Sequence, residues 1–381
     1  DITKKFFSNG SELKISYDKS LPIKDEKMHD KNGYQTDKNT TEYLDDASIS
    51  WTLPLLKNKG GLVDQKTYDL AVLDYEDERL VLAEAKEDFI EAKLTIFLDW
   101  ISYHTQIDIV KNRLKASKDI LKTIQAQNVS KTSALTMRRS INKSQRLLLD
   151  LESKLKAEQR LLIAVLENVD LDANPLKINW NTRVDLIQDL HQYCKESIRD
   201  IKRIEIEQLK NKRSVKTYQN SELADFDFTI SATQDDNKGN YSTYSKSSEV
   251  EYEAKLEFSY PLTGDTSNDV YLSKYRLKGR QLELKYQDKL DDIVSDAQKL
   301  TTELKQGVKQ LTLYQQQIDE SEGSDAELNE FLAGNGNIRF VINEQDEQQS
   351  LLLEQVGAAI NYHKNRIKYN SLMDRLLINV I

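Results

Sequence analysis

The feature that most constrains this chain is a long stretch without any helix-breaking residue. From Val63 to Gln127 the sequence holds neither proline nor glycine, the residues least compatible with a helix interior. As a single helix rising 1.5 Å per residue, this stretch would reach about 95 Å. The whole chain has only 4 Pro and 12 Gly, and 31% of its residues are charged, so very long helices with wet faces are expected.

Apolar residues repeat along two such stretches with the 3-4 spacing of a coiled coil. The first set is Ile107, Val110, Leu114, Ser117, Leu121 and Ile124, and the second is Tyr286, Leu290, Ile293, Ala297, Leu300, Leu304 and Leu311. A stripe with this spacing requires partner helices along its length. The two long helices are therefore expected to pack against other helices.

The chain also contains one unit twice, at a constant offset. Trp51-Thr52-Leu53-Pro54-Leu55 recurs 207 residues later as Phe258-Ser259-Tyr260-Pro261-Leu262. The polar turn Asn128-Val129-Ser130 falls on Asn335-Gly336-Asn337 at the same offset. Each unit is expected to hold a pair of strands, a long helix, a tight turn and a returning helix. Since a globular enzyme rarely duplicates so long a helix, the repeat indicates an assembly.

Four segments alternate apolar and polar residues with a period of two, which is typical of strands with one apolar face. These segments are Leu13–Tyr17, Tyr43–Leu53, Ala224–Ala232 and Val250–Tyr260. Polar stretches at roughly 19–41 and 234–248 join them in pairs and are expected to be surface loops.

The order of these signals predicts five parts. They are a first β hairpin (1–56), a first long helical hairpin (57–168), an insert with an ascending helix (169–220), a second β hairpin (221–262) and a second long helical hairpin (263–381) with an interruption near 319–332.

Two isolated hairpins are too few strands for a stable sheet, so strands from several chains are expected to close into a barrel. The alternation is that of membrane barrels, whose apolar outer face is covered by lipid. Trp51, Phe258 and Tyr260 would then form an aromatic girdle. The opposite face would line a wet, acidic channel, with Asp225, Asp227, Glu251, Glu253 and Glu257. The competing interpretation is a water-soluble sandwich with one apolar face.

Composition and motifs exclude several classes of function. A net charge of −9 argues against a nucleic-acid partner. The sequence contains no run of 18 apolar residues, so no transmembrane helix is expected. The four histidines, His29, His104, His191 and His363, lie far apart and lack metal-ligand spacing. Without a catalytic constellation, the chain is not expected to be an enzyme or to hold a cofactor or metal.

With its duplicated strands and long helices, the chain resembles the TolC family of outer-membrane efflux proteins. Both Pro-Leu motifs that end the second and fourth strand segments resemble the family's pattern. So do the turn Gly336–Asn343 and the ending Tyr362–Asn370. The family's helical segment ahead of the first strand has no counterpart among the expected elements.

The resemblance implies an α+β membrane protein that forms a homotrimer. Its twelve-stranded β-barrel, with four strands per chain, would lie in outer-membrane lipid of a Gram-negative bacterium. A long α-helical barrel of coiled-coil helices would continue it through the periplasm. A periplasmic adaptor and an inner-membrane pump or ABC transporter are the implied partners.

The resemblance also implies that the helix tips carry function. Acidic residues after the second turn constrict the tunnel in the family, and Glu344, Asp346 and Glu347 are the candidates here. Arg138 and Arg139 follow the first turn and could pair with these acids as a salt-bridge lock. The alternative is that both sets are solvated surface groups, the acids being favoured by the helix dipole. The expected adaptor-docking residues are Val129, Ser130, Gly336 and Asn337.

The predicted function is therefore a passive conduit of a tripartite export system, for drugs, toxins or secreted proteins. The inner-membrane transporter would supply the energy. The alternative function is a soluble coiled-coil scaffold or adaptor protein with small β modules.

Overall fold

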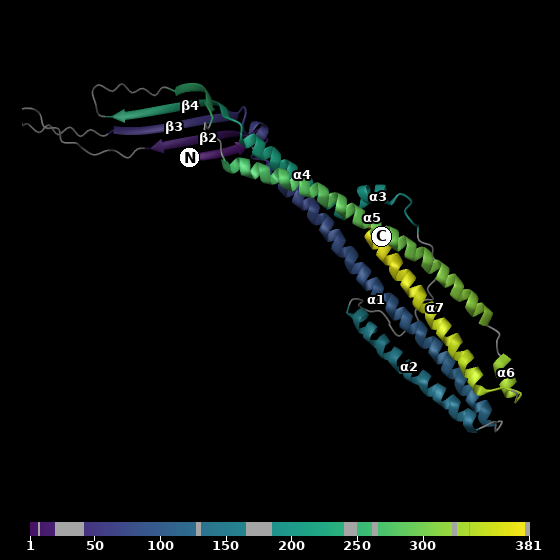
Figure 1. Ribbon diagram of the computed structural model, residues 1–381. Helices are drawn as coiled ribbons and strands as arrows, with labels where there is room; N and C mark the ends of the chain where they lie inside the picture. The colour runs from purple at the N-terminus through teal and green to yellow at the C-terminus, as the bar shows by residue number, and fades with distance from the viewer. Residues whose placement is uncertain are drawn as a thin grey trace, which may run out of the picture. The chain divides into compact units, whose positions relative to one another are not determined.

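The structure is a computed structural model that describes residues 1–6, 8–19, 42–126, 131–164, 185–239, 250–260, 266–321, 326–334 and 336–377 (Figure 1). The chain divides into two compact units. The first, called the sheet unit, comprises Asp1–Glu78 and Arg203–Tyr286. The second, called the helical unit, comprises Arg79–Lys202 and Gln287–Ile381.

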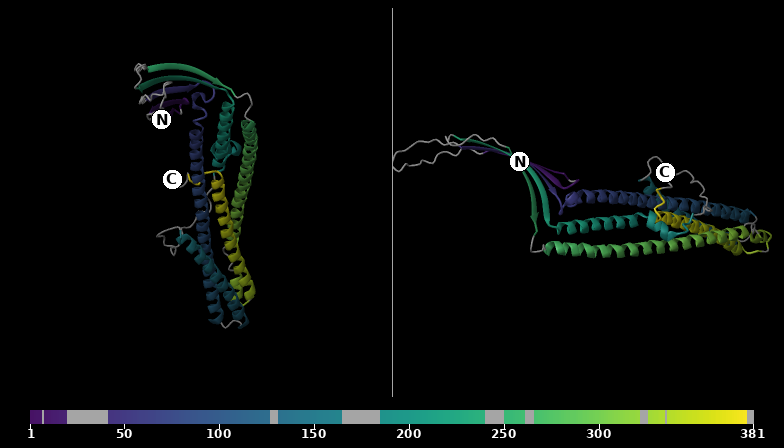
Figure 2. Two further views of the ribbon diagram at one scale, coloured as in Figure 1. Left: turned by 90° about the vertical axis from the view of Figure 1, so that its left-hand side faces the viewer. Right: turned by 90° about the horizontal axis from the view of Figure 1, so that it is seen from above.

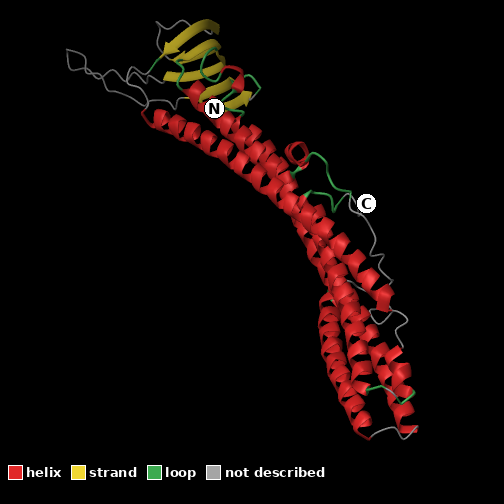
Figure 3. Cartoon of the chain, turned by 45° about the vertical axis from the view of Figure 1, so that its right-hand side comes forward, coloured by secondary structure: helices red, strands yellow, loops and turns green. Residues whose placement is uncertain are grey.

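The sheet unit contains one antiparallel sheet whose strands follow one another in sequence order, β1-β2-β3-β4-β5 (Figure 3). The strands are β1 Ile2–Phe6, β2 Ser11–Lys19, β3 Glu42–Pro54, β4 Asp225–Gly239 and β5 Val250–Ser259. Strands β3 and β4 pair directly, although they belong to the two different copies of the repeat. The two expected hairpins therefore join into one sheet within a single chain.

Strand β1 differs from the sequence expectation, which counted four strands per chain. It pairs with β2 along Ile2↔Ile15 to Phe6↔Ser11. Its alternation is weak because Lys4 stands in the row of Ile2 and Phe6, so no period-2 signal marks it.

The helices are α1 Lys66–Ala126, α2 Lys131–Ile163, α3 Leu190–Ser197, α4 Arg199–Ser221, α5 Thr266–Ser321, α6 Ala326–Leu332 and α7 Ile338–Leu372, with the short 3-10 turn η1 Lys59–Gly61. Both long helices and the returning helices α2 and α7 thus form where the sequence predicts them. Among the described residues, none of the helices is long and apolar enough to cross a membrane.

The ascending helix expected within 169–220 is in fact two helices, α3 and α4. Ile198 has an extended backbone (φ −73°, ψ 127°) and separates α3 from α4. No glycine or proline marks this break. The expected insert at 169–184 lies outside the described residues.

In the helical unit, α1, α2 and α7 lie side by side (Figure 2). Their shared core is formed by Ile107, Val110, Leu114, Ile120, Ile124, Met137, Ile141, Leu151, Phe331, Ile338, Val341 and Ile342. The seam predicted for α1 supplies four of its six residues to this core as buried side chains, while Leu121 packs at its margin and Ser117 is buried as a polar residue. The 3-4 spacing therefore identified the packed face correctly.

In the sheet unit, Asn58 joins the end of β3 to the start of α1 and the end of α4. Its backbone N–H donates to Oδ1 of Asn220 (2.7 Å), and its own Oδ1 accepts from the backbone N–H of Val63 (2.9 Å). Gly10, in the β1–β2 turn, lies so close that a Cβ there would be 2.6 Å from the carbonyl oxygen of Asn58. Asn58 itself has a left-handed backbone (φ 62°), which asparagine tolerates well.

Candidate functional site

One face of the sheet carries apolar rows that cross from β2 to β5. The register places Leu13 beside Trp51, Trp51 beside Ile230, and Ile230 beside Ala254. A second row runs Ile15, Ile49, Ala232 and Tyr252. Many of these side chains are exposed in the single chain, and Tyr252 and Leu256 are 81% and 63% exposed. An exposed apolar face of this extent marks a surface that contacts lipid or another protein.

The opposite face of the sheet is polar. Its rows join Glu12, Thr52, Thr229 and Lys255, then Ser16, Ser48, Thr233 and Glu251. Hydroxyl groups pair across the strands, with 2.5 Å between the Oγ atoms of Ser16 and Ser48 and 3.1 Å between Oγ1 of Thr52 and Thr229. The polar face of the sheet can therefore contact water while the apolar face contacts an apolar environment.

The three expected girdle aromatics lie on the apolar face or at its end. Phe258 contacts Phe226 edge to face, with ring centroids 6.2 Å apart. Tyr260 follows the last residue of β5 and is 55% exposed. Trp51 shares its cross-strand row with Ile230 and not with Phe258, so the three residues do not form one straight row along the ladder. Their role as a girdle remains a prediction.

The turn between α6 and α7 is built by residues with special backbone requirements. Gly334 has φ +88°, and a Cβ on Gly336 would lie 2.7 Å from the backbone nitrogen of Phe331. Asn337 caps α7 by accepting a hydrogen bond from the backbone N–H of Arg339 (3.0 Å). The companion residues Val129 and Ser130 lie outside the described residues.

Arg113 lies in α1, between three and four turns before the end of that helix, and its buried side chain connects α1, α2 and α7. The Arg113 guanidinium donates to Oδ1 of Asp346 (3.2 Å), to Oγ of Ser140 (3.5 Å), and to the side chains of Ser117 and Gln345. Burial lowers the pKa of Arg113, and the hydrogen bond and charge of Asp346 oppose that change. Of the three acidic gate candidates, Asp346 is thus held within its own chain. Lys143 adds a second ion pair to it (3.2 Å).

The other gate candidates are more open. Arg138, Arg139 and Glu347 are exposed, and Glu344 is half-buried. Within the described part of the chain, none of these four forms an ion pair. The single chain therefore brings Asp346 to Arg113 and Lys143, and it does not bring the candidate arginines to the candidate acids.

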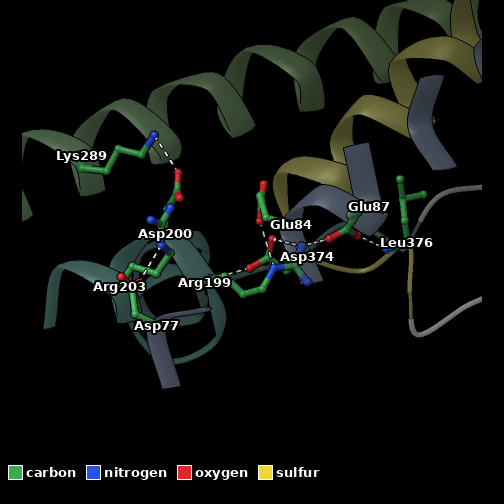
Figure 4. A network of polar contacts seen from close by, with 9 residues as sticks. All are labelled: Asp77, Glu84, Glu87, Arg199, Asp200, Arg203, Lys289, Asp374 and Leu376. Atoms are coloured by element: carbon green, nitrogen blue, oxygen red, sulfur yellow. Dashed lines mark hydrogen bonds and ion pairs between the residues drawn. The ribbon is translucent and has the colours of Figure 1, made fainter. Parts of the chain in front are cut away.

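A second polar cluster lies nearer the start of α1, in the helical unit (Figure 4). Nε of Arg199 donates to Oε2 of Glu84 (3.0 Å), and the same guanidinium pairs with Asp374 (3.0 Å) and Glu87. Glu87 accepts a hydrogen bond from the backbone N–H of Leu376 (2.6 Å). The cluster thereby fastens the segment after α7 to α1 and to the first turn of α4.

The three carboxylates of this cluster have oxygen atoms within 4.8 Å of one another, as a cation site would require. The Arg199 guanidinium already lies among them, so one positive charge faces three carboxylates. Burial raises the pKa of Asp374 to about 6, while the backbone hydrogen bond and charge of Arg199 oppose the increase. Near neutral pH this site therefore holds a costly buried charge.

Comparison with solved structures identifies the fold. Over 96% of this chain and 83% of CusC, a protein whose transmembrane channel formation has been described, the two superpose with a TM-score of 0.70 at 10% identity. The outer-membrane channel OprN gives 0.69 at 11% identity over 96% of this chain and 82% of OprN. The outer membrane protein VceC of Vibrio cholerae gives 0.63 at 12% identity over 96% of this chain and 86% of VceC. The fold is that of the outer-membrane channels.

The resemblance to the TolC family is thereby confirmed at the level of the fold. No family model matches the sequence, and no curated protein matches it either. At 10 to 12% identity, these solved structures show the likeness of the fold.

Sequence reasoning missed the two arginines that organise the helical part of this channel fold. Arg113 directly precedes Leu114 of the predicted seam, and a charged residue beside an apolar stripe is usually solvated. Arg199 has its partners more than a hundred residues away in sequence, at Glu84, Glu87 and Asp374. No local signal distinguishes either residue from the many exposed arginines and lysines.

Proposed function

We propose that this chain is one protomer of a trimeric outer-membrane channel. Three copies, each contributing β2 to β5, would close a twelve-stranded barrel. The observation that carries the proposal is the apolar face of those four strands, which is exposed in the single chain and alternates with a polar face. Closure would remove the open edges of the sheet, and lipid would cover the apolar face.

The long helices support a tunnel that continues the barrel. With 61 residues at 1.5 Å each, α1 measures about 90 Å, and α5 has 56 residues. Helices of this length in three copies would enclose a passage through the periplasm. The chain would perform no chemistry of its own. Drugs, toxins or secreted proteins are the proposed cargo, and an inner-membrane pump or ABC transporter would drive them through a periplasmic adaptor.

The helix tips are the proposed docking and closing points. Val129, Ser130, Gly336 and Asn337 would contact the adaptor. Arg138 and Arg139 would pair with Glu344 or Glu347 of a neighbouring protomer in the closed state. Asp346 would contribute less to such a lock, because Arg113 and Lys143 already neutralise it within the chain.

Purification of the full chain tests the channel proposal. The channel should sediment with membranes, require detergent, and appear as a three-fold particle by electron microscopy. In planar bilayers it should conduct ions. A detergent-independent monomer that does not conduct would overturn the proposal and favour the soluble coiled-coil scaffold.

Single-channel recording tests the lock separately. Arg138→Ala and Arg139→Ala should raise the conductance or the open fraction of the closed channel. Arg146→Ala is the matched control, because Arg146 is an exposed arginine farther along the same helix. Unchanged conductance in both the Arg138 and the Arg139 variant would refute the salt-bridge lock while leaving the channel proposal intact.

A further inference from the structure

A group of exposed basic residues lies where α4 and α5 approach the sheet. Helix α4 ends at Ser221, shortly before β4 begins at Asp225, and α5 begins at Thr266, shortly after β5 ends at Ser259. The group, called the basic patch, consists of Lys212, Lys216, Lys274, Arg276, Lys278 and Arg280. At 1.5 Å per residue, all of them lie within about 20 Å of the helix end that is next to the sheet.

The two helices that carry the basic patch pack against each other in the sheet unit (Figure 2). Nδ2 of Asn211 donates to the backbone carbonyl oxygen of Tyr275 (2.9 Å). Nδ2 of Asn268 donates to the backbone carbonyl oxygen of Tyr218 (3.2 Å). The ring of Tyr218 also stacks on those of Tyr271 and Tyr275, with centroids 5.5 and 5.3 Å apart. The basic patch therefore belongs to one packed helix pair, with three tyrosines among its residues.

The positive charge of the basic patch is not balanced within the described residues. Acids at the start of α1 pair with other bases of α4, Asp69 with Arg213 (2.6 Å), Asp74 with Lys210 (2.6 Å) and Asp77 with Arg203 (2.9 Å). None of the six patch residues forms an ion pair in the part of the chain that the structure describes. Glu222 and Asp269 are the exposed acids closest to these helix ends in sequence, and they are too few to neutralise the patch.

The first copy of the repeat lacks these charges. At the offset of 207 residues, the patch positions Lys274, Arg276 and Lys278 correspond to Thr67, Asp69 and Ala71. The start of a long helix after a strand pair therefore does not itself require basic residues. Their presence on α5 indicates a partner of negative charge.

We propose that the basic patch binds the anionic headgroups of phospholipids, in the leaflet that borders the helical part of the channel. This inference rests on the proposed trimeric channel and adds a class of lipid to its partners. Where lipid covers the apolar face of β4 and β5, the ends of these strands lie near the headgroups, and the patch follows directly. Basic residues beside a membrane surface attract anionic lipids, and tyrosines favour the same interface.

Lipid selectivity in bilayers tests this proposal. The full chain is reconstituted in phosphatidylcholine, and electron paramagnetic resonance of spin-labelled lipids compares the association of phosphatidylglycerol with that of phosphatidylcholine. The wild type should prefer phosphatidylglycerol by about threefold or more at low salt. The preference should disappear at about 1 M salt, where the Debye length is about 3 Å. The combined variant Lys274→Gln, Arg276→Gln and Lys278→Gln should bind both lipids equally at low salt.

Two control variants separate position from charge. Lys299→Gln, Lys305→Gln and Lys309→Gln together remove the same charge from exposed positions farther along α5, and this variant should keep the preference of the wild type. Lys274→Arg, Arg276→Lys and Lys278→Arg together keep the charge of the patch, and this variant should keep the preference as well.

The outcomes distinguish this proposal from the channel proposal. The lipid patch is refuted if the glutamine variant of the patch keeps its preference, or if the distant control loses as much. Loss of the trimer in that patch variant, at unchanged helical content, also refutes it, because the basic residues would then contact another chain. A conducting trimer with no preference for phosphatidylglycerol refutes the patch alone. If the wild type forms no trimer, both proposals fail.

Discussion

Replacing Asp374 by asparagine should stabilise the protein at neutral pH and remove a pH dependence. Asp374 is nearly buried beside Arg199, Glu84 and Glu87, and its pKa is raised from 3.8 to about 6. A shift of about two units corresponds to about 3 kcal/mol of preference for the protonated carboxyl in the folded state. Asparagine resembles that neutral form and tolerates the left-handed backbone of this position (φ 55°).

The sign of this pH dependence follows from proton binding to Asp374. Because the folded pKa is raised, the folded state binds the proton more tightly than the unfolded state between pH 4 and 6. Stability from this group is therefore greatest at low pH and is lost as pH rises through about 6. Asp374→Asn should match the wild type near pH 4 and exceed its free energy of unfolding by up to about 3 kcal/mol at pH 7.5.

Urea unfolding in detergent, followed by far-ultraviolet circular dichroism at four pH values from 4.5 to 7.5, measures this difference. The control is Asp150→Asn, because Asp150 is more than half exposed and, among the residues that the structure describes, pairs only with Lys154 on the same helix. That variant should stay within about 0.5 kcal/mol of the wild type. The reasoning is refuted if Asp374→Asn keeps the pH slope of the wild type, or if it is the less stable protein at pH 7.5.

Two further predictions concern the helical unit. Arg113→Ala should lower the free energy of unfolding by about 3 kcal/mol, because Asp346 and the neighbouring polar groups lose a buried partner. Thermal unfolding measures this loss of stability, and an unchanged midpoint would contradict the role assigned to Arg113. Gly307→Ala should not increase stability despite the better helix propensity of alanine, since the new Cβ would lie 3.1 Å from the ring of buried Tyr362. Gly357 has open space around it, so Gly357→Ala should stabilise the protein by about 1 kcal/mol. Equal stabilisation by both alanines would show that the close approach at Gly307 is unimportant.

Periodicity predicted the long elements well, because their pattern is repeated over many turns. The expected helix at Val63 to Gln127 is observed as Lys66–Ala126, and the strand expected at Tyr43–Leu53 is observed as Glu42–Pro54. Over such lengths an apolar stripe outweighs local variation in propensity.

The missed features depend on partners distant in sequence. The break at Ile198 occurs where the backbone N–H of Arg199 donates to the Asp374 carboxylate, so the new helix start is capped from the other end of the chain. Arg113 is buried among partners from two other helices, Ser140 of α2 and Asp346 of α7. None of these partners can be inferred from a local window of sequence.

The hydrogen bonds around Asn58 constrain the start of α1. Asn58 sets the direction in which α1 departs from the sheet, through its bonds to Asn220 and Val63. The first turns of α1, up to Glu78, belong to the same compact unit as the sheet. The hydrogen bonds of Asn58 therefore fix the direction in which the longest described helix begins, before any of its coiled-coil contacts are made.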